Sequence, residues 1–332
     1  MSVLSNKYFH DEAAAFAKLE SIVWPEGPTC PHCGNAGKVY ELKGVRSKPS
    51  KKNPEGVERH GLKKCAECRK QFTVRVGTVF ESSHVELHKW LQAAYLMASS
   101  KKGVSAHQMH RALEVTYKTA WFMEHRLREA MRSGALDPFG GAGKVVEMDE
   151  TYFGRVKKPT PHKVMGGEFS GSRFGRGPSN KRAVISLVER GGKVRSFHVP
   201  KATRAGVEKI VAENVDKESR LHTDESQLYN KTKQKGLVAD HETVRHSADE
   251  YVRGDVTSNS VENYFSVFKR GMRGTYQHCA EKHLHRYLAE FDFRFNNRIA
   301  LGVDDMERTD AVLSGISGKR LTYRISCGTA NA

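Results

Sequence analysis

The spacing of apolar residues predicts an alternation of helices and strands along the chain. Apolar positions recur every three or four residues, the period of an amphipathic helix, over residues 10–23, 87–95, 105–113, 117–132, 204–215, 261–272 and 282–297. Short runs of β-forming residues are typical of strands over residues 38–42, 72–76, 145–154, 182–189, 193–199, 220–226 and 242–247. We therefore expect an α/β protein, with a glycine-rich link at residues 133–143 between its two halves.

Four cysteines in the first half predict a zinc site. Cys30 and Cys33 form one Cys-x-x-Cys pair, and Cys65 and Cys68 form a second. Two such pairs supply four thiolates to a tetrahedral Zn²⁺, which leaves no open position and makes the site structural rather than catalytic. The strand-like pieces beside the pairs indicate a zinc ribbon. A redox pair or unliganded thiols are the alternative, and His32 is a weaker candidate ligand.

The helices predicted over residues 105–113 and 117–132 are joined by a short turn, as in a helix-turn-helix. We expect Lys118, His125 and Arg132 on the outward face of the second helix, where cations meet DNA phosphates. Any two short helices with a tight turn fit the same pattern. The neighbouring zinc ribbon and the charge of the chain favour DNA binding.

The chain has 55 Lys and Arg against 38 Asp and Glu, a formal net charge of +17. This excess suits a polyanion, and double-stranded DNA is the expected partner, although charge alone would also suit an anionic membrane surface. No stretch approaches the roughly 20 apolar residues of a membrane-spanning helix, so we expect a cytoplasmic protein without membrane contact. A basic, glycine-rich loop over residues 155–180 is either a further phosphate contact or a solvated insertion.

Three acidic residues stand where a metal-dependent site needs them. Asp149 ends a buried strand, where an ionised carboxylate needs a positive partner such as a divalent cation. Asp224 lies at the end of another predicted strand, and Glu262 lies on the polar face of a helix that carries Lys269 two turns later. Taken singly, each acid also fits a turn or a solvated helix face.

These segments together resemble the DDE transposases of bacterial insertion sequences, in the branch with an N-terminal zinc ribbon and an ISXO-like catalytic domain. The resemblance rests on Cys-Pro-His-Cys-Gly (30–34), Val-Glu-Met-Asp-Glu-Thr-Tyr-Phe-Gly (146–154), His-Thr-Asp (222–224), Ser-Val-Glu-Asn-Tyr-Phe-Ser-Val-Phe-Lys-Arg-Gly (260–271) and His-Arg-Tyr-Leu-Ala-Glu-Phe-Asp-Phe-Arg-Phe-Asn-Asn-Arg (285–298). It implies an RNase H-like catalytic domain whose metal-binding acids are Asp149, Asp224 and Glu262. Some relatives carry Asn at the third position, and the resemblance favours Glu262 over Asn263.

The resemblance also implies an order of domains. We expect a leading helix (1–24), a zinc ribbon (25–80), a helix-turn-helix-like DNA-binding region (81–135), an RNase H-like catalytic domain (144–300) and a C-terminal tail (301–332). The candidate DNA-binding residues are Lys118, Lys269, Arg270 and Arg273.

The implied activity is that of a transposase, which binds the terminal inverted repeats of an insertion sequence and catalyses DNA cleavage and strand transfer. Two Mg²⁺ or Mn²⁺ ions would activate first a water and then a 3′-hydroxyl for in-line attack on a phosphodiester. Joining two ends requires at least a dimer on DNA, in a bacterial, nucleoid-associated setting. The alternatives are an RNase H-like nuclease or resolvase that cuts without joining, and a catalytically inert DNA-binding regulator.

Overall fold

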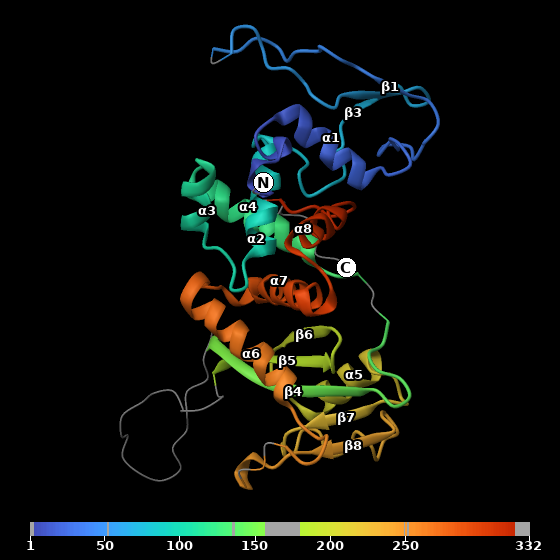
Figure 1. The fold of residues 1–332 in the computed structure, drawn as a ribbon, viewed down its shortest axis with the longest axis vertical. Helices are drawn as coiled ribbons and strands as arrows, with labels where there is room; N and C mark the ends of the chain where they lie inside the picture. Colours follow the sequence, from blue (N-terminus) through green and yellow to red (C-terminus); the bar gives the residue numbers. More distant parts are fainter. Residues whose placement is uncertain are drawn as a thin grey trace. The chain divides into compact units, whose positions relative to one another are not determined.

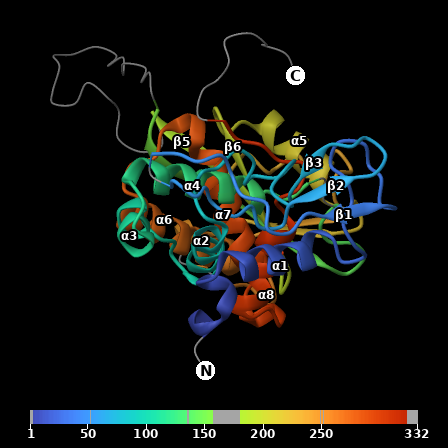
Figure 2. The same ribbon diagram turned by 90° about the horizontal axis from the view of Figure 1, so that it is seen from above.

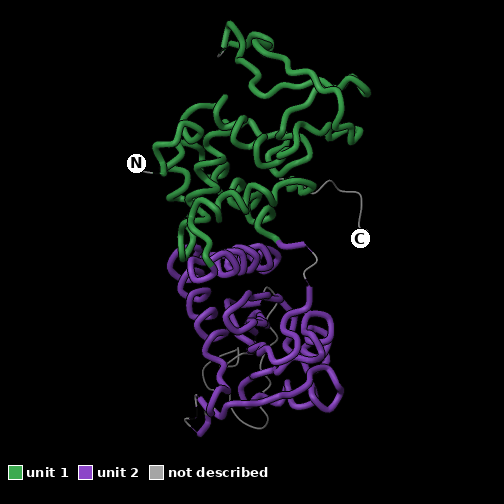
Figure 3. Tube along the Cα trace, turned by 45° about the vertical axis from the view of Figure 1, so that its right-hand side comes forward, with its two compact units in different colours: residues 1–132, 302–332 green, residues 133–301 purple. Residues whose placement is uncertain are grey.

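The computed structural model describes residues 3–51, 53–134, 137–156, 180–248, 250 and 252–322. The chain divides into two compact units, which we call unit 1 (residues 1–132 and 302–332) and unit 2 (residues 133–301), shown in different colours in Figure 3. Most of the basic loop predicted over residues 155–180 lies outside the described residues. Among the described residues, no helix has both the length and the apolar character needed to cross a membrane.

Unit 1 begins with a helix and a small antiparallel sheet. Helix α1 (Glu12–Val23) starts where the Asp11 side chain accepts a 2.7 Å hydrogen bond from the Ala14 N–H. The sheet has the order β1-β2-β3, with β1 (Val39–Glu41), β2 (Lys63–Cys65) and β3 (Gln71–Phe72) side by side in Figure 2. Buried Phe72 packs with Cys30 and Cys65, so the predicted ribbon has a core built on its own cysteines.

Three helices follow the ribbon in unit 1: α2 (Leu87–Ser99), α3 (Ala106–Leu113) and α4 (Tyr117–Met131). Ser105 caps α3, as predicted, by accepting a hydrogen bond from the Gln108 N–H. The outward position predicted for His125 is wrong, because α4 packs against α2 and α3 and leaves His125 only 1% exposed. Lys118 and Arg132, near the two ends of α4, are exposed.

The segment predicted as a C-terminal tail contains a further helix, α8 (Asp305–Ser314). Asp304 and Glu307 form a capping box at its start. Val312, Leu313 and Ile316 are buried, and α8 packs against α1, α2 and α4. The description of this whole segment as a tail is therefore wrong: residues 305–316 complete the core of unit 1.

Unit 2 is built on one five-stranded sheet in the order β6-β5-β4-β7-β8. β4 (Val145–Arg155), β5 (Lys181–Glu189) and β6 (Val194–Val199) form an antiparallel meander, whereas β7 (Arg220–Thr223) and β8 (Asp240–Thr243) run parallel to β4. Figure 1 shows β4 in the middle of this sheet. This arrangement is the RNase H-like fold that the sequence predicts.

Helices cover both faces of the sheet of unit 2. Alternate strand residues point to opposite faces, so Ile185 packs with helix α5 (Arg204–Asn214), whereas Val184 packs with α6 (Asn259–Gly271) and α7 (Leu284–Asn296). Both faces of β4 are buried as a result. Of the carboxylates on this strand, Glu147 is buried, whereas Asp149 and Glu150 in its middle are partly exposed.

Candidate active site

Asp149 and Asp224 come from neighbouring parallel strands. β4 pairs with β7 so that Glu147 lies opposite His222. Two residues further along the same register, Asp149 falls level with Asp224, just past Thr223 at the end of β7. Sheets of this kind bind ligands outside the carboxyl ends of their strands. The two acids therefore meet just past the point where the parallel pairing of β4 with β7 ends. The prediction that Asp149 ends its strand is wrong, because β4 continues to Arg155 in its pairing with β5.

A third carboxylate, that of Glu150, joins this pair, although no sequence pattern predicts a role for it. One carboxylate oxygen each of Asp149, Glu150 and Asp224 lies within 4.8 Å of the others. The hydroxyl of Tyr229, a fully buried side chain, donates a hydrogen bond to Glu150 Oε2. Strand alternation sets Glu150 on the opposite face of β4 from Asp149. Both carboxylates approach Asp224 because β4 continues beyond the last residue of β7.

The electrostatics of this cluster suit a cation. Burial, followed by the charges of Asp224 and Glu150 and then Glu262, raises the pKa of Asp149 from 3.8 to about 8. Burial also raises the pKa of Glu150. Carboxylates held together in a partly buried site favour protonation unless a positive charge meets them. Hard oxygen ligands of this kind fit Mg²⁺ or Mn²⁺.

Glu262 and Lys269 lie on α6, which packs against β4. Glu262 is in the first turn of the helix, and its Oε1 accepts a 2.8 Å hydrogen bond from Ser258 Oγ. It is not in the close trio of carboxylates, but its charge contributes to the raised pKa of Asp149. Burial lowers the pKa of Lys269, and the charge of Asp149 opposes this shift. Glu262 thus acts on the pKa of Asp149, and Asp149 acts on the pKa of Lys269.

The other two basic candidates of this region lie at the end of α6. Arg270 is exposed and donates two hydrogen bonds to Ser266 Oγ. Arg273 is exposed in the π-helical turn that follows (Met272–Tyr276). The charges of Arg273 and Lys181 help to lower the pKa of Lys269. These cations form a basic surface beside the acidic cluster.

Replacing Asp149 with Asn should stabilise the protein when no divalent cation is bound. Because the pKa of Asp149 is about 8 in the folded protein and ordinarily 3.8, the folded state holds a proton that the unfolded state loses. The stability that this proton adds is fully present below pH 3.8, the ordinary pKa, and is lost as the pH rises through about 8, the pKa in the folded protein. The gain in unfolding free energy of Asp149→Asn over wild type should therefore grow between about pH 5 and about pH 9, by at least about 1.4 kcal/mol, the equivalent of one pKa unit.

Chemical denaturation of zinc-loaded protein, without Mg²⁺ or Mn²⁺, at both pH values measures this difference. Glu213→Gln is the matched control, because Glu213 is an exposed acid on α5 that faces the other side of the sheet. The unfolding free energy of Glu213→Gln should change with pH as that of the wild type does between about pH 5 and about pH 9. A gain for Asp149→Asn that is equal at both pH values contradicts the prediction.

In unit 1 the four predicted zinc ligands come together. The Sγ atoms of Cys30, Cys33, Cys65 and Cys68 lie within 4.8 Å of one another, and the Cys30–Cys68 and Cys33–Cys65 separations are both 3.7 Å. The backbone N–H of Cys68 is the main cause that lowers the pKa of Cys65 to about 7. A cluster of four thiols with one predisposed to ionise fits a structural Zn²⁺.

The start of α4, the second helix of the predicted helix-turn-helix, is open to solvent. Lys118 and Tyr117 are exposed in its first turn, and Tyr117 stacks on His107 of α3 at a centroid distance of 4.4 Å. Glu114 adopts a left-handed conformation with φ of 52° in the turn between the helices. A recognition helix contacts DNA bases with its N-terminal residues, so Lys118 is well placed for this role.

Comparison with known proteins finds one matching domain model in each of the two units of the chain. Residues 141–296 match the model of the ISXO2-like transposase domain, and residues 10–71 match that of the transposase zinc-ribbon domain. An uncharacterized protein in transposable element ISH50 of Halobacterium salinarum is 27% identical over 297 residues, which cover 87% of this chain and 92% of that protein. The crystal structure of a pre-cleavage Mos1 transpososome aligns at 10% identity, covering 70% of this chain and 79% of that one, with a TM-score of 0.25, too low to carry an argument.

The two matched domains account for both clusters of ligands described above. All four residues of the cysteine cluster lie within the zinc-ribbon match, and all three residues of the acidic cluster lie within the transposase match. The chain belongs to the insertion-sequence transposases that combine a zinc ribbon with an ISXO2-like transposase domain.

Proposed function

We propose that the chain binds the terminal inverted repeats of an insertion sequence and catalyses metal-dependent DNA cleavage and strand transfer. The observation that most supports this proposal is the meeting of Asp149 and Asp224 where the pairing of two parallel strands ends in an RNase H-like sheet. Beside them, α6 supplies a further acid and several cations. This combination suits a phosphodiester, which needs metal ligands at the reacting atoms and positive charge along its backbone.

In this proposal Asp149, Asp224 and Glu262 are the catalytic metal ligands for Mg²⁺ or Mn²⁺. Bound divalent cations would make a water or a 3′-hydroxyl more nucleophilic and offset the charge that develops on the phosphate. Asp149 is oriented by the hydrogen bond that its Oδ1 accepts from the Glu150 N–H, and Asp224 Oδ1 accepts one from the Ser226 N–H. These bonds to the backbone fix both carboxylates before substrate arrives.

The DNA contacts are proposed to divide between the two units. The zinc ribbon and the first turn of α4, with Lys118, would bind the inverted repeats, while Arg270 and Arg273 would hold phosphates near the acidic cluster. Because two ends must be joined, the active form would be at least a dimer on DNA. The net charge of +17 supports extensive contact with double-stranded DNA.

Lys269 is proposed to contact the phosphate that reacts. Lys269→Ala is therefore expected to slow cleavage by about 100-fold, the usual loss for one group that stabilises developing charge, while affinity for the ends changes little. Arg270→Ala is the matched comparison on the same helix. It should instead weaken binding of any DNA and reduce the salt dependence of affinity by about one unit of slope, as for a single phosphate contact.

Single-turnover cleavage and equilibrium binding over a range of salt concentrations separate the two effects. The prediction for Lys269 is wrong if Lys269→Ala weakens binding as Arg270→Ala does and leaves the rate on bound DNA unchanged. Both residues would then be ordinary phosphate contacts.

The proposed function is tested by incubating the wild type with labelled DNA that carries the native ends of its element, with and without Mg²⁺ or Mn²⁺. Cleavage at the ends and joining to a second DNA, both dependent on the cation, are expected. Nicking without joining would favour a nuclease or resolvase. Specific binding of the ends without any cutting would favour an inert regulator.

A further inference from the structure

Glu147 is a fully buried carboxylate on β4, two residues before Asp149. Its two oxygens accept five hydrogen bonds. Arg190 donates from Nε and Nη2 to Oε1, at 3.1 and 2.9 Å, and Ser260 Oγ donates to the same oxygen at 3.0 Å. The backbone N–H groups of Ser260 and Val261 donate to Oε2 at 2.8 and 3.2 Å. Burial of the charge is therefore compensated on every side by donors.

The two backbone donors belong to the first turn of α6. N–H groups in the first turn of a helix have no partner within the helix, and the positive end of the helix dipole attracts an anion. The residue at the helix start, Ser258, makes no capping bond to the backbone, because its hydroxyl donates to Glu262 instead. Glu147 thus caps α6 from another element. It does so at the residues immediately before Glu262.

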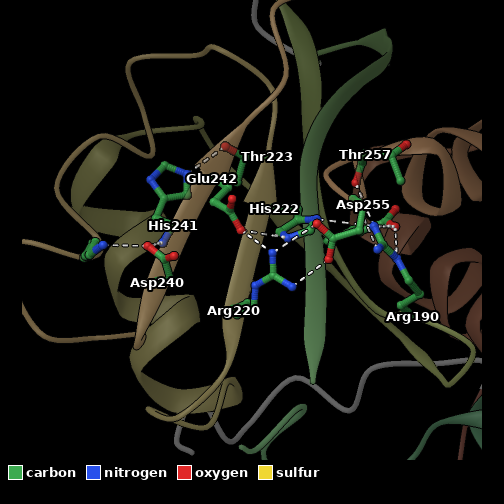
Figure 4. Close-up of polar contacts among 11 residues, drawn as sticks. Arg190, Arg220, His222, Thr223, Asp240, His241, Glu242, Asp255 and Thr257 are labelled. Carbon is green, nitrogen blue, oxygen red and sulfur yellow. Dashed lines mark hydrogen bonds and ion pairs between the residues drawn. The ribbon is translucent and has the colours of Figure 1, made fainter. Parts of the chain in front are cut away.

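Arg190 extends the same connection to the segment that leads into α6. It lies in the turn between β5 and β6 and donates to the carbonyl oxygens of Asp255 and Thr257, at 2.7 and 3.3 Å (Figure 4). Arg220 of β7 binds the Asp255 carboxylate at 2.6 Å, so a second arginine holds this segment from the sheet. The approach to α6 and its first turn are therefore tied to β4, to β7 and to the β5–β6 turn.

We propose that Glu147 is a positioning residue, which fixes the start of α6 on β4 and thereby sets the place of Glu262 relative to Asp149. This role of Glu147 rests on the proposed function, in which Glu262 is a ligand of the metal site. The alternative is that Glu147 and Arg190 contribute only to general stability. The two roles differ in what happens to metal affinity when Glu147 is changed and unit 2 remains folded.

Glu147→Gln is the informative change. The amide keeps the size of the side chain but replaces one acceptor oxygen by an NH₂ group, which then faces N–H donors. We expect faster amide exchange at Ser260 and Val261 and a Kd for Mn²⁺ raised by about ten-fold, the scale on which groups that orient metal ligands act. Val211→Ala, which truncates a buried residue of α5 on the other face of the sheet, controls for general destabilisation.

Mn²⁺ binding is followed by the electron paramagnetic resonance signal of the free ion, on zinc-loaded full-length protein. The double variant Glu147→Gln/Glu262→Gln should bind Mn²⁺ no more weakly than Glu262→Gln, because Glu147 acts through Glu262. Val211→Ala should bind like the wild type.

Three results would overturn the inference. The first is that folded Glu147→Gln binds Mn²⁺ with wild-type affinity. The second is that Glu147→Gln still weakens Mn²⁺ binding by the same factor when Glu262→Gln is already present. The third is that Val211→Ala weakens Mn²⁺ binding as much as Glu147→Gln does. If the wild type binds no Mn²⁺, the proposed metal site is refuted, and amide exchange at Ser260 and Val261 still decides whether Glu147 anchors α6. Unchanged exchange there rejects the anchor as well.

Discussion

Replacing Asp224 with Asn should abolish both DNA cleavage and strand transfer while leaving binding of the ends intact. Asp224 contributes one of the carboxylate oxygens that lie within 4.8 Å of one another beside the end of β7. A neutral amide oxygen is a much weaker ligand for a divalent cation than a carboxylate, and both reactions depend on the same ions. We expect the rates to fall by at least about 1,000-fold, equivalent to about 4 kcal/mol in activation free energy.

Cleavage and joining of labelled ends, with binding measured on the same DNA, provide the test. Glu262→Gln should behave in the same way, and Glu213→Gln should cut and join like the wild type. Glu150→Gln distinguishes the trio of carboxylates in the structure from the set implied by the family resemblance. A loss in Glu150→Gln as large as that in Asp224→Asn would make Glu150 a ligand. A cleavage rate of Asp224→Asn within about ten-fold of the wild-type rate would contradict the assignment of Asp224.

Replacing Cys65 with Ser should release the structural zinc and remove specific binding of the ends. Cys65 is fully buried in the cysteine cluster, and Phe72 packs against it in the ribbon core. Binding of Zn²⁺ supplies the free energy of folding in such small domains, so the ribbon should unfold when one thiolate is lost. Affinity for the ends should fall by about two orders of magnitude or more, because the ribbon no longer presents a fixed surface.

Metal analysis of the purified protein and binding of labelled ends measure both consequences. Cys279→Ser is the matched control, since Cys279 is a partly buried cysteine of unit 2 outside the cluster. It should retain the zinc and bind the ends normally. Retention of zinc and of end binding by Cys65→Ser would show that the four cysteines do not act as one site.

Periodicity in the sequence predicts most of the fold because nearly every element buries a clear stripe of apolar residues. The stripe of Val261, Tyr264, Phe265 and Phe268 is an example, and it forms the inner face of α6. The tail prediction failed because α8 has few apolar residues, and its burial depends on α2, far away in the sequence. The outward position predicted for His125 is wrong for a related reason. A polar residue is expected on the exposed face of α4, but α2 and α3 pack against this helix and leave His125 buried.

The candidate site is predicted only in part from the sequence. Asp149 and Asp224 stand out as acids beside runs of buried strand residues, and the structure brings them together where the pairing of β4 with β7 ends. Glu150 could not be assigned from strand alternation, which sets it on the opposite face of β4 from Asp149. Its carboxylate joins the cluster only through its tertiary proximity to Asp224. Glu147 carries no signal of its own, since its five donors come from residues as distant as Arg190 and Ser260. Tertiary contacts, not local pattern, give both residues their place.

The position of α8 has a consequence for the order in which the protein matures on the ribosome. Unit 1 is assembled from residues on both sides of unit 2, and α8 supplies part of its core. During synthesis the strands and helices of unit 2 emerge before α8 does, and domains fold as their residues become available. The unit that carries the zinc ribbon is therefore completed last. In a nascent chain, the core of unit 1 is complete only after all of unit 2 has been made.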